Sequence, residues 1–240
     1  MFDILAQTNP AVKIEEETDY IPGSVRNTGF YPCVLKYAYL DESQPNPQKN
    51  TLGGARNINL VFDIDGAEWT HKEYISSAKE KNQSITYTND KGTFPLPGYA
   101  KMEALFKQFT GKGISAQDGE EKTLKIWDGK AETLQKRAVF TEMTKTPMIL
   151  ALVKVLEDKY GSPGETRNVT EIEKFLSPEG LTAPEMAKGM TEGTWGDTWL
   201  AGHPADFVKD KRKNKSTTAG APTASKGAPA AGASLFNKPA

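Results

Sequence analysis

Residues 57–77 read NINLVFDIDGAEWTHKEYISS. The first part of this stretch, Asn57–Ile64, alternates along the chain with period two, which is the pattern of a β-strand that buries one face. The side chains expected on the core face are Ile58, Leu60, Phe62 and Ile64. Asp65-Gly66 follows at once and is a strong hairpin signal, because a type I′ turn needs positive φ at both central residues. The sequence therefore predicts that Glu68–Ser77 runs back antiparallel beside the first strand.

Further strands and short helices are predicted on both sides of this hairpin. The expected strands are Tyr31–Leu40, Ser84–Thr88, Thr93–Leu96, Thr123–Trp127, Leu134–Met143 and Thr146–Glu157, the last being the most hydrophobic and so the most buried. The expected helices are Tyr99–Thr110, with Gly111 as its C-cap, then Glu171–Leu176 and Pro184–Met190, with Thr182 as an N-cap. Three strands, a helix and two strands is the order of a five-stranded Greek-key OB-fold barrel. We therefore expect a mainly β chain of this type with an additional hairpin and a helical C-terminal extension.

Composition excludes several classes of protein. The chain has 240 residues, a formal net charge of −1, one cysteine and two histidines. A single Cys33 cannot form an intramolecular disulfide, and two histidines leave too few ligands for a zinc cage, so no metal or cofactor is expected. No apolar run approaches the roughly 18 residues of a membrane span, and the acidic N-terminus does not resemble a secretion signal. We expect a cytoplasmic protein with no membrane partner.

Charge and composition divide the chain into four parts. These are an N-terminal extension (1–20), the OB-fold domain (21–160), a helical or strap extension that packs on the barrel (161–207) and a basic tail (208–240). Residues 207–240 contain seven Lys or Arg against one acid, and the end of the tail is rich in Ala, Pro and Gly, so disorder is expected there. The tail ends in an isolated apolar tip with Leu235, Phe236 and Lys238, which is either a random end or a peptide hook that orders on a partner.

Several segments resemble phage-encoded single-stranded-DNA-binding proteins of the replication and recombination type. The resemblance is carried by Tyr31–Leu40, the GGAR loop leading into NINLVFDIDG, YISSAKEKNQSITY followed by TFPLPGY, the helix ending in FTGK, and KTPMILALVK. It covers about residues 20 to 160 and implies an OB-fold that coats single strands in the host cytoplasm, with aromatic side chains stacked on bases. Many such proteins have an acidic C-terminal tail, whereas this tail is basic, which puts the way it recruits replication or recombination proteins in doubt.

The residues contain what this function needs. Binding a single strand without sequence preference requires cationic groups for phosphates and flat aromatic faces for bases. Lys72 and Tyr74 should share one face of a strand, and Trp69 should face the opposite way. The candidate DNA-binding residues are Lys36, Tyr37, Tyr39, Arg56, Trp69, Lys72, Tyr74, Lys79, Lys81 and Tyr87. For each aromatic the alternative is core packing, and for each lysine it is a solvated surface charge. RNA in place of DNA stays open, because stacking and backbone contacts depend little on the 2′ position.

Other functions rest on separate residues. Asp63, Asp65 and Glu68 could suggest a metal-dependent nuclease, but the turn explains Asp65 and no second acidic cluster accompanies them, so we expect no enzyme. Trp195–Phe207 is either a strap on the barrel or a docking surface of a protein-interaction or scaffold module in a replication or transcription complex. A basic cluster either holds phosphates or begins a solubilising linker, and it contains Lys209, Lys211, Arg212, Lys213 and Lys215.

Overall fold

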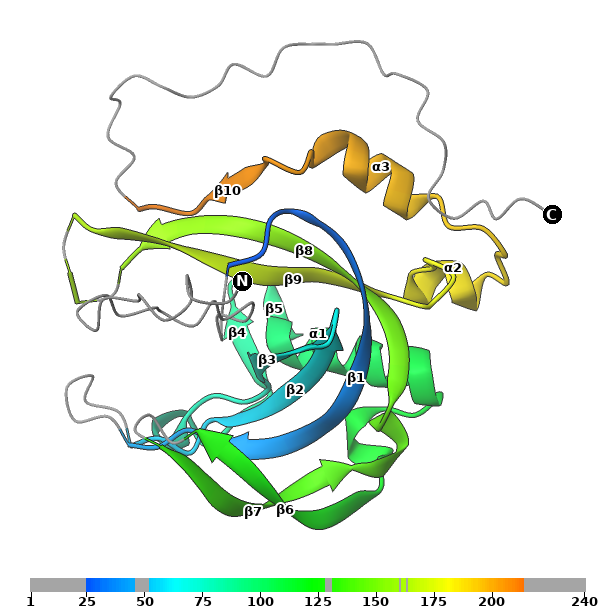
Figure 1. Ribbon diagram of the computed structural model, residues 1–240. Helices are drawn as coiled ribbons and strands as arrows, with labels where there is room; N and C mark the ends of the chain where they lie inside the picture. Colours follow the sequence, from blue (N-terminus) through cyan, green and yellow to red (C-terminus); the bar gives the residue numbers. More distant parts are fainter. Residues whose placement is uncertain (1–24, 46–51, 128–130, 160, 163, 214–240) are drawn as a thin grey trace, which may run out of the picture.

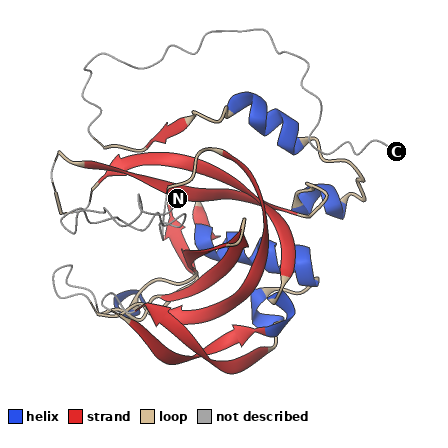
Figure 2. Ribbon diagram, viewed as in Figure 1, coloured by secondary structure: helices blue, strands red, loops and turns tan. Residues whose placement is uncertain are grey.

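The structure is a computed structural model that describes residues 25–45, 52–127, 131–159, 161–162 and 164–213. It is mainly β with a few short helices (Figures 1 and 2). Eight strands form one continuous sheet, and two more form a separate hairpin. The N-terminal extension through residue 24 and the tail tip with Leu235, Phe236 and Lys238 lie outside the described residues.

The hairpin predicted from residues 57–77 is confirmed. Strands β2 (Arg56–Ile64) and β3 (Ala67–Tyr74) pair antiparallel, from Asn57 opposite Tyr74 to Ile64 opposite Ala67. Asp65 and Gly66 have φ values of 56° and 80°, as a type I′ turn requires. The four side chains expected in the core are fully buried. The other face of β2 is largely buried too, so a further element must cover it.

Strand β1 (Gly29–Glu42) is long and bent, and it joins three neighbours. Its later part pairs antiparallel with β2, and a β-bulge interrupts the register between Leu35 and Tyr37. Its opposite edge pairs first with β8 (Thr146–Asp158) and then, at Tyr39 and Leu40, with β7 (Glu132–Phe140). A bulge bends a strand locally. This bend lets one strand serve two differently directed parts of the sheet, as the blue ribbon in Figure 1 shows.

The remaining strands extend the sheet beyond β8 and β7, on the edge of β1 opposite to β2. Strand β9 (Thr166–Leu176) pairs antiparallel with β8, and β10 (Val208–Asp210) pairs with β8 in parallel. Strand β6 (Gly119–Trp127) pairs with β7, and this hairpin curves below β1 and β2 in Figure 1. The predicted helix at Glu171–Leu176 is therefore wrong. The unpaired edge of β8 offers backbone partners to this segment, and Ile172 and Phe175 reach the core from it.

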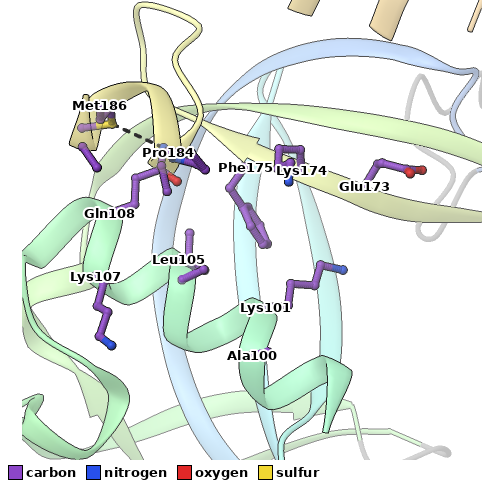
Figure 3. A pocket seen from close by; sticks show the side chains of 13 residues that line it. Ala100, Lys101, Leu105, Lys107, Gln108, Glu173, Lys174, Phe175, Pro184 and Met186 are labelled. Atoms are coloured by element: carbon purple, nitrogen blue, oxygen red, sulfur yellow. Dashed lines mark hydrogen bonds between the residues drawn. The ribbon is translucent and has the colours of Figure 1, made fainter. Parts of the chain in front are cut away.

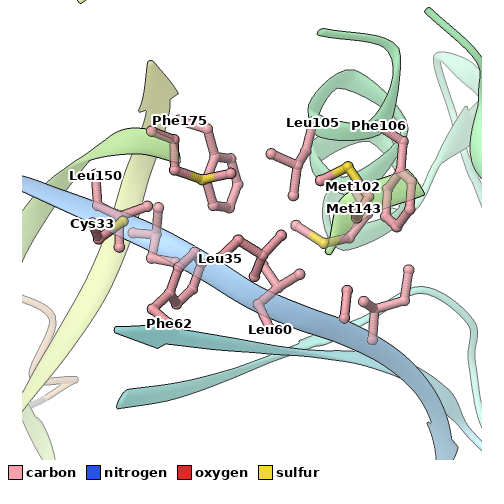
Figure 4. Packing of buried hydrophobic residues seen from close by; sticks show 14 of the residues in the cluster. Cys33, Leu35, Leu60, Phe62, Met102, Leu105, Phe106, Met143, Leu150 and Phe175 are labelled. Atoms are coloured by element: carbon pink, nitrogen blue, oxygen red, sulfur yellow. The ribbon is translucent and has the colours of Figure 1, made fainter. Parts of the chain in front are cut away.

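The main core lies between the sheet and helix α1 (Pro97–Thr110) (Figure 4). Met102, Leu105 and Phe106 of α1 are buried against β-strand side chains, and Gly111 ends the helix with φ 73°, as expected of a C-cap. The predicted strand through Met143 is too long. β7 ends at Phe140, and a 3₁₀ turn, η5 (Thr141–Met143), carries Met143 into the same core.

Small elements surround this core. Strands β4 (Thr86–Asn89) and β5 (Gly92–Pro95) form the separate hairpin, preceded by the turn η3 (Lys79–Lys81), and a second turn, η4 (Ile114–Ala116), follows α1. Helix α2 (Ala183–Ala187) begins with a capping box between Thr182 and Glu185, which confirms the predicted N-cap.

The segment after α2 is a strap on the sheet. Helix α3 (Trp195–Gly202) packs on the outer side of β8, where Trp199 stacks on Phe30 with ring centroids 5.1 Å apart. Trp199 is buried with Val153 and Val155 of β8. Trp195–Phe207 thus lies against the outer side of β8. Residue 160, predicted as a domain boundary, falls in the connection between β8 and β9, two paired strands of one sheet.

Candidate nucleic-acid interface

Strands β1, β2 and β3 place a set of aromatic and polar side chains on one outer face. In the β2–β3 register, Asn57 lies opposite Tyr74 and Asn59 lies opposite Lys72. Tyr39 of β1 lies opposite Asn59 on the other side of β2. Because paired residues project to the same side of a sheet, these positions share a face, with Tyr37 beside Val61 continuing it. Tyr74 is 49% exposed on this face.

The β6–β7 hairpin covers part of the same face. Tyr39, Val61 and Val139 form a small buried cluster, and Tyr37, Leu124 and Ile126 pack against it. Tyr39 is only 5% exposed, and burial raises the pKa of its hydroxyl to about 12. Tyr37 is half-buried, with its ring centroid 6.3 Å from that of Tyr39. These two tyrosines form the covered floor beneath the hairpin, whereas Tyr74 lies beyond its cover.

A groove lies at the edge of the β6–β7 hairpin, next to the part of the outer face that the hairpin does not cover. Its volume is about 390 Å³. Its walls are the end of β1 with the start of the loop that follows, the end of β3, and the β6–β7 hairpin. The lining residues are Asp41, Glu42, Ser43, Gln44, Lys72, Tyr74, Ile126, Gln135 and Arg137. The groove therefore combines one exposed aromatic ring with two cationic and two anionic side chains.

The two cations of the groove differ in their surroundings. Arg137 Nε lies 3.0 Å from Asp41 Oδ1, but no acceptor in the described part of the chain lies in line with the buried Nε hydrogen. The same guanidinium donates to the Gln135 side chain and to the Lys136 carbonyl oxygen, which fixes its orientation. Lys72 forms no ion pair with any side chain that the structure describes. The Arg137 guanidinium is thus fixed in orientation while its Nε hydrogen has no acceptor in line with it within the described ranges. The Lys72 ammonium is available to an anion.

The β4–β5 hairpin adds a second exposed aromatic surface. Tyr87 and Phe94 lie directly opposite each other with ring centroids 5.9 Å apart, and they are 42% and 39% exposed. The base of this hairpin lies close to the end of β3, because Gly98 at the start of α1 abuts the Tyr74 carbonyl. A Cβ at Gly98 would lie 2.1 Å from that oxygen. A glycine is needed here for close approach, and it joins the second aromatic surface to the strand that carries Tyr74.

The structure brings some of the predicted DNA-binding residues together. Tyr37, Tyr39, Lys72 and Tyr74 share the outer face. Arg56 precedes Asn57 on β2 and falls on the opposite face by the same alternation, with its Nε 3.9 Å from Glu42 Oε1. Trp69 lies on the opposite face, as expected from the alternation, where it stacks on Phe62 with ring centroids 5.8 Å apart.

The other predicted residues lie apart from the groove lining. Lys36 is the extra residue of the β1 bulge, and its Nζ lies 2.6 Å from Glu68 Oε2. The Lys79 side chain runs against Gly54, where a Cβ would lie 2.5 Å from it, and Lys81 is exposed in the same 3₁₀ turn. Tyr87 belongs to the β4–β5 hairpin.

Several residues of the groove and of the second aromatic surface are not among those predicted from the sequence. Asp41, Gln135 and Arg137 come from segments whose approach to β3 depends on how the β6–β7 hairpin folds back, so no local pattern indicates them. Phe94 had a usable signal, because a turn at Asn89–Gly92 places it opposite Tyr87.

Three of the four described residues of the basic cluster are engaged in ion pairs. Lys211 Nζ lies 2.7 Å from Glu171, Lys209 lies 3.7 Å from Glu173, and Arg212 pairs with Asp210 at 2.8 Å. The two lysine pairs connect the β10 segment to β9, whereas the Arg212–Asp210 pair lies within the segment itself. They leave this segment with little free positive charge for phosphates.

Several comparisons bear on this chain. No family model, no curated protein and no solved structure matches it.

Among the described residues, no helix is long and apolar enough to cross a membrane, and no group of three or more His, Cys, Asp or Glu side chains is placed to hold a metal ion. Two of the acids considered for a nuclease have other contacts: Asp63 Oδ1 accepts a hydrogen bond from the Gly66 amide, and Glu68 pairs with Lys36.

Proposed function

We propose that this protein binds single-stranded DNA without strong sequence preference and that it protects the strand during phage replication or recombination. The observation that carries the proposal is the groove in which Tyr74 and Lys72 lie beside Arg137. An exposed ring can stack on a base, and adjacent cations can hold the flanking phosphates. The Tyr87–Phe94 pair would extend the path of the strand.

We further propose that β1, β2, β3, β8 and β9 correspond to the five strands of an OB-fold barrel. Support comes from their antiparallel pairing in the order β9-β8-β1-β2-β3 and from α1, which falls between the third and fourth of them in the chain. OB-folds bind oligonucleotides on the face of strands 2 and 3 and with the loop between strands 1 and 2. In this chain the strand face would be represented by Lys72 and Tyr74, and the loop by Ser43 and Gln44, which follow the end of β1. The β6–β7 hairpin is then an insertion that forms the second wall.

The test is a fluorescence-anisotropy titration of labelled poly(dT), poly(U) and duplex DNA with the full chain at several salt concentrations. Preference for the single strands, with affinity that falls as salt rises, is the expected result. Tyr74→Ala should weaken binding by about 5- to 150-fold, since a stacked base contributes roughly 1–3 kcal/mol. Lys72→Ala should reduce the salt dependence.

Two control variants match these substitutions. Leu134→Ala removes an apolar side chain that is 71% exposed on β7 and absent from the groove lining. Lys188→Ala removes an exposed charge at the end of α2. Both should bind as the unmodified chain does. Absence of single-strand binding at low salt would overturn the proposal.

The alternative is a protein-interaction module of a replication or transcription complex. The Trp195–Phe207 segment does not favour it, because Trp199 is buried in the strap. Recruitment of replication or recombination proteins through Leu235, Phe236 and Lys238 stays a prediction, and a pull-down with and without substitutions at these positions would test it.

A further inference from the structure

A second, larger groove lies away from the proposed nucleic-acid interface. Its volume is about 960 Å³, and it runs between α1, the C-terminal part of β9 and α2 (Figure 3). Leu105 of α1 and Phe175 of β9 face the same space, and Pro184 and Met186 close one end from α2. Much of the remaining wall is alanine. The groove is therefore an apolar trough of a size that fits a short peptide segment.

The wall formed by β9 has an open backbone edge. Within the described residues, β9 pairs only with β8. The N–H and C=O groups on its other edge are thus available to an added extended segment, a common mode of peptide recognition. The groove offers side-chain pockets directly beside this edge.

The N-terminal part of the chain enters the described fold next to β9. The Arg26 amide donates to Thr170 Oγ1 at 2.8 Å. Thr170 and Phe175 lie on the same strand, five residues or about 17 Å apart at the rise of a β-strand. Eleven residues, from Ile14 to Ser24, span up to about 36 Å when extended. The N-terminal segment is therefore tethered within reach of the groove, which gives it a high effective concentration there.

The chemistry of this segment complements the groove. Residues 1–24 contain five acids and one lysine, and three of the acids are consecutive at Glu15–Glu17. Ile14, Tyr20 and Ile21 supply apolar side chains around them. The groove lining contains Lys101, Lys107 and Lys174 against the single acid Glu173. Lys101 Nζ already lies 2.9 Å from Glu73 Oε2, and Lys174 Nζ lies over the Trp195 ring, 5.7 Å from its centroid. The Lys107 side chain is 61% exposed although it pairs with Glu103, so its ammonium can accept a second anionic partner.

We propose that residues 14–21 dock in this groove in cis, as an extended segment along the free edge of β9. The apolar side chains of this segment occupy the groove, and its glutamates lie against the lysines that line the groove. This docking does not depend on nucleic-acid binding and uses no residue of the proposed DNA groove.

The test uses the full isotope-labelled chain with a nitroxide spin label at Glu179→Cys, an exposed position in the turn before α2. Cys33 is buried, and burial raises the pKa of its thiol to about 12, so the label attaches at the engineered cysteine. The amide signals of residues 14–21 should lose most of their intensity by paramagnetic broadening. A label at Leu134→Cys on the β6–β7 hairpin should leave the same signals unchanged.

A charge-reversal variant provides a second test of the docking in the same spin-label experiment. Replacing Glu15, Glu16 and Glu17 with lysine should restore the signals of residues 14–21 with the label at position 179. These positions lie outside the described fold, so the variant does not disturb the groove itself. Equal broadening from both label positions, or none from either, would overturn the proposal. Broadening in a mixture of spin-labelled and isotope-labelled chains would also overturn it, since a second copy would then be the occupant.

Discussion

Arg137 Nε and Asp41 Oδ1 lie 3.0 Å apart at one wall of the groove beside Tyr74. Arg137 belongs to the β6–β7 hairpin, whereas Asp41 lies near the end of β1, so the ion pair fastens the hairpin to the sheet. Asp41 also occupies the position where a phosphate would approach the guanidinium. The proposed function therefore predicts that the two residues have opposite effects on binding.

Arg137→Ala should weaken single-strand binding and make the slope of log affinity against log salt shallower by about 0.7 for each lost phosphate contact. Asp41→Asn should strengthen binding, because it removes an anion that competes with the phosphate for the guanidinium. Salt titrations of both variants measure the two effects. If Asp41→Asn weakened binding as much as Arg137→Ala, the ion pair would serve only to hold the β6–β7 hairpin on the sheet and would not contact the nucleic acid.

The β4–β5 hairpin gives a second prediction. Tyr87→Ala and Phe94→Ala should each reduce affinity for poly(dT) by the equivalent of about 1–3 kcal/mol if a base stacks on the pair. Tyr87→Phe should retain binding, since the ring face is kept. Ile85→Ala is the matched control, because this exposed side chain lies at the base of the hairpin and has no ring. A similar loss in the Ile85 variant would indicate a general disturbance of the hairpin.

A substitution at Gly98 should lower both the free energy of unfolding and the affinity for single strands. Gly98→Ala places a Cβ 2.1 Å from the Tyr74 carbonyl oxygen, so the start of α1 and the end of β3 must separate. Overpacking of this kind costs about 1–3 kcal/mol, and the free energy of unfolding in urea should fall by that amount. Single-strand affinity should fall as well because Tyr74 shifts. Gly202→Ala, where a Cβ meets no atom within 4 Å, should leave both quantities nearly unchanged.

The Glu185 carboxylate joins the start of α2 to the start of α3, and we expect its contribution to the free energy of unfolding to be lost in acid. Its carboxylate accepts hydrogen bonds from the backbone amides of Thr182, Trp195 and Thr194. Burial alone would raise the pKa of this carboxyl, but these hydrogen bonds outweigh burial and lower the pKa to about 2 from an ordinary value of 4.5. Because the folded-state pKa is the lower one, the stabilisation is complete above about pH 4.5 and is lost as pH falls toward 2.

Urea unfolding at neutral pH and in acid measures this contribution. Glu185→Gln should cost on the order of 2 kcal/mol at pH 7, where the charged acceptor is lost. The difference between this variant and the unmodified chain should shrink as pH falls from 4.5 toward 2. A difference that stayed constant over that range would show that the hydrogen bonds do not depend on the charge.

Some elements follow from local interactions and could be predicted from the amino-acid sequence alone. The β2–β3 hairpin follows from period-two alternation and from a turn whose two residues adopt positive φ. Helix α1 follows from its apolar spacing and its glycine cap, and α2 begins at the predicted Thr182. The opposite orientations of Trp69 and Tyr74 likewise need only the alternation of a regular strand.

What covers each face of the sheet depends on segments that are distant in the chain and could not be predicted locally. Glu171–Leu176 became a strand because the edge of β8, distant in the chain, offered backbone partners. Tyr39 is buried and Tyr74 exposed on the same face because the β6–β7 hairpin reaches one and stops short of the other. Lys209 of β10 and Lys211 just after it pair with Glu173 and Glu171 of β9. Periodicity shows which side chains share a face, but their burial and charge pairing depend on contacts between segments far apart in the chain.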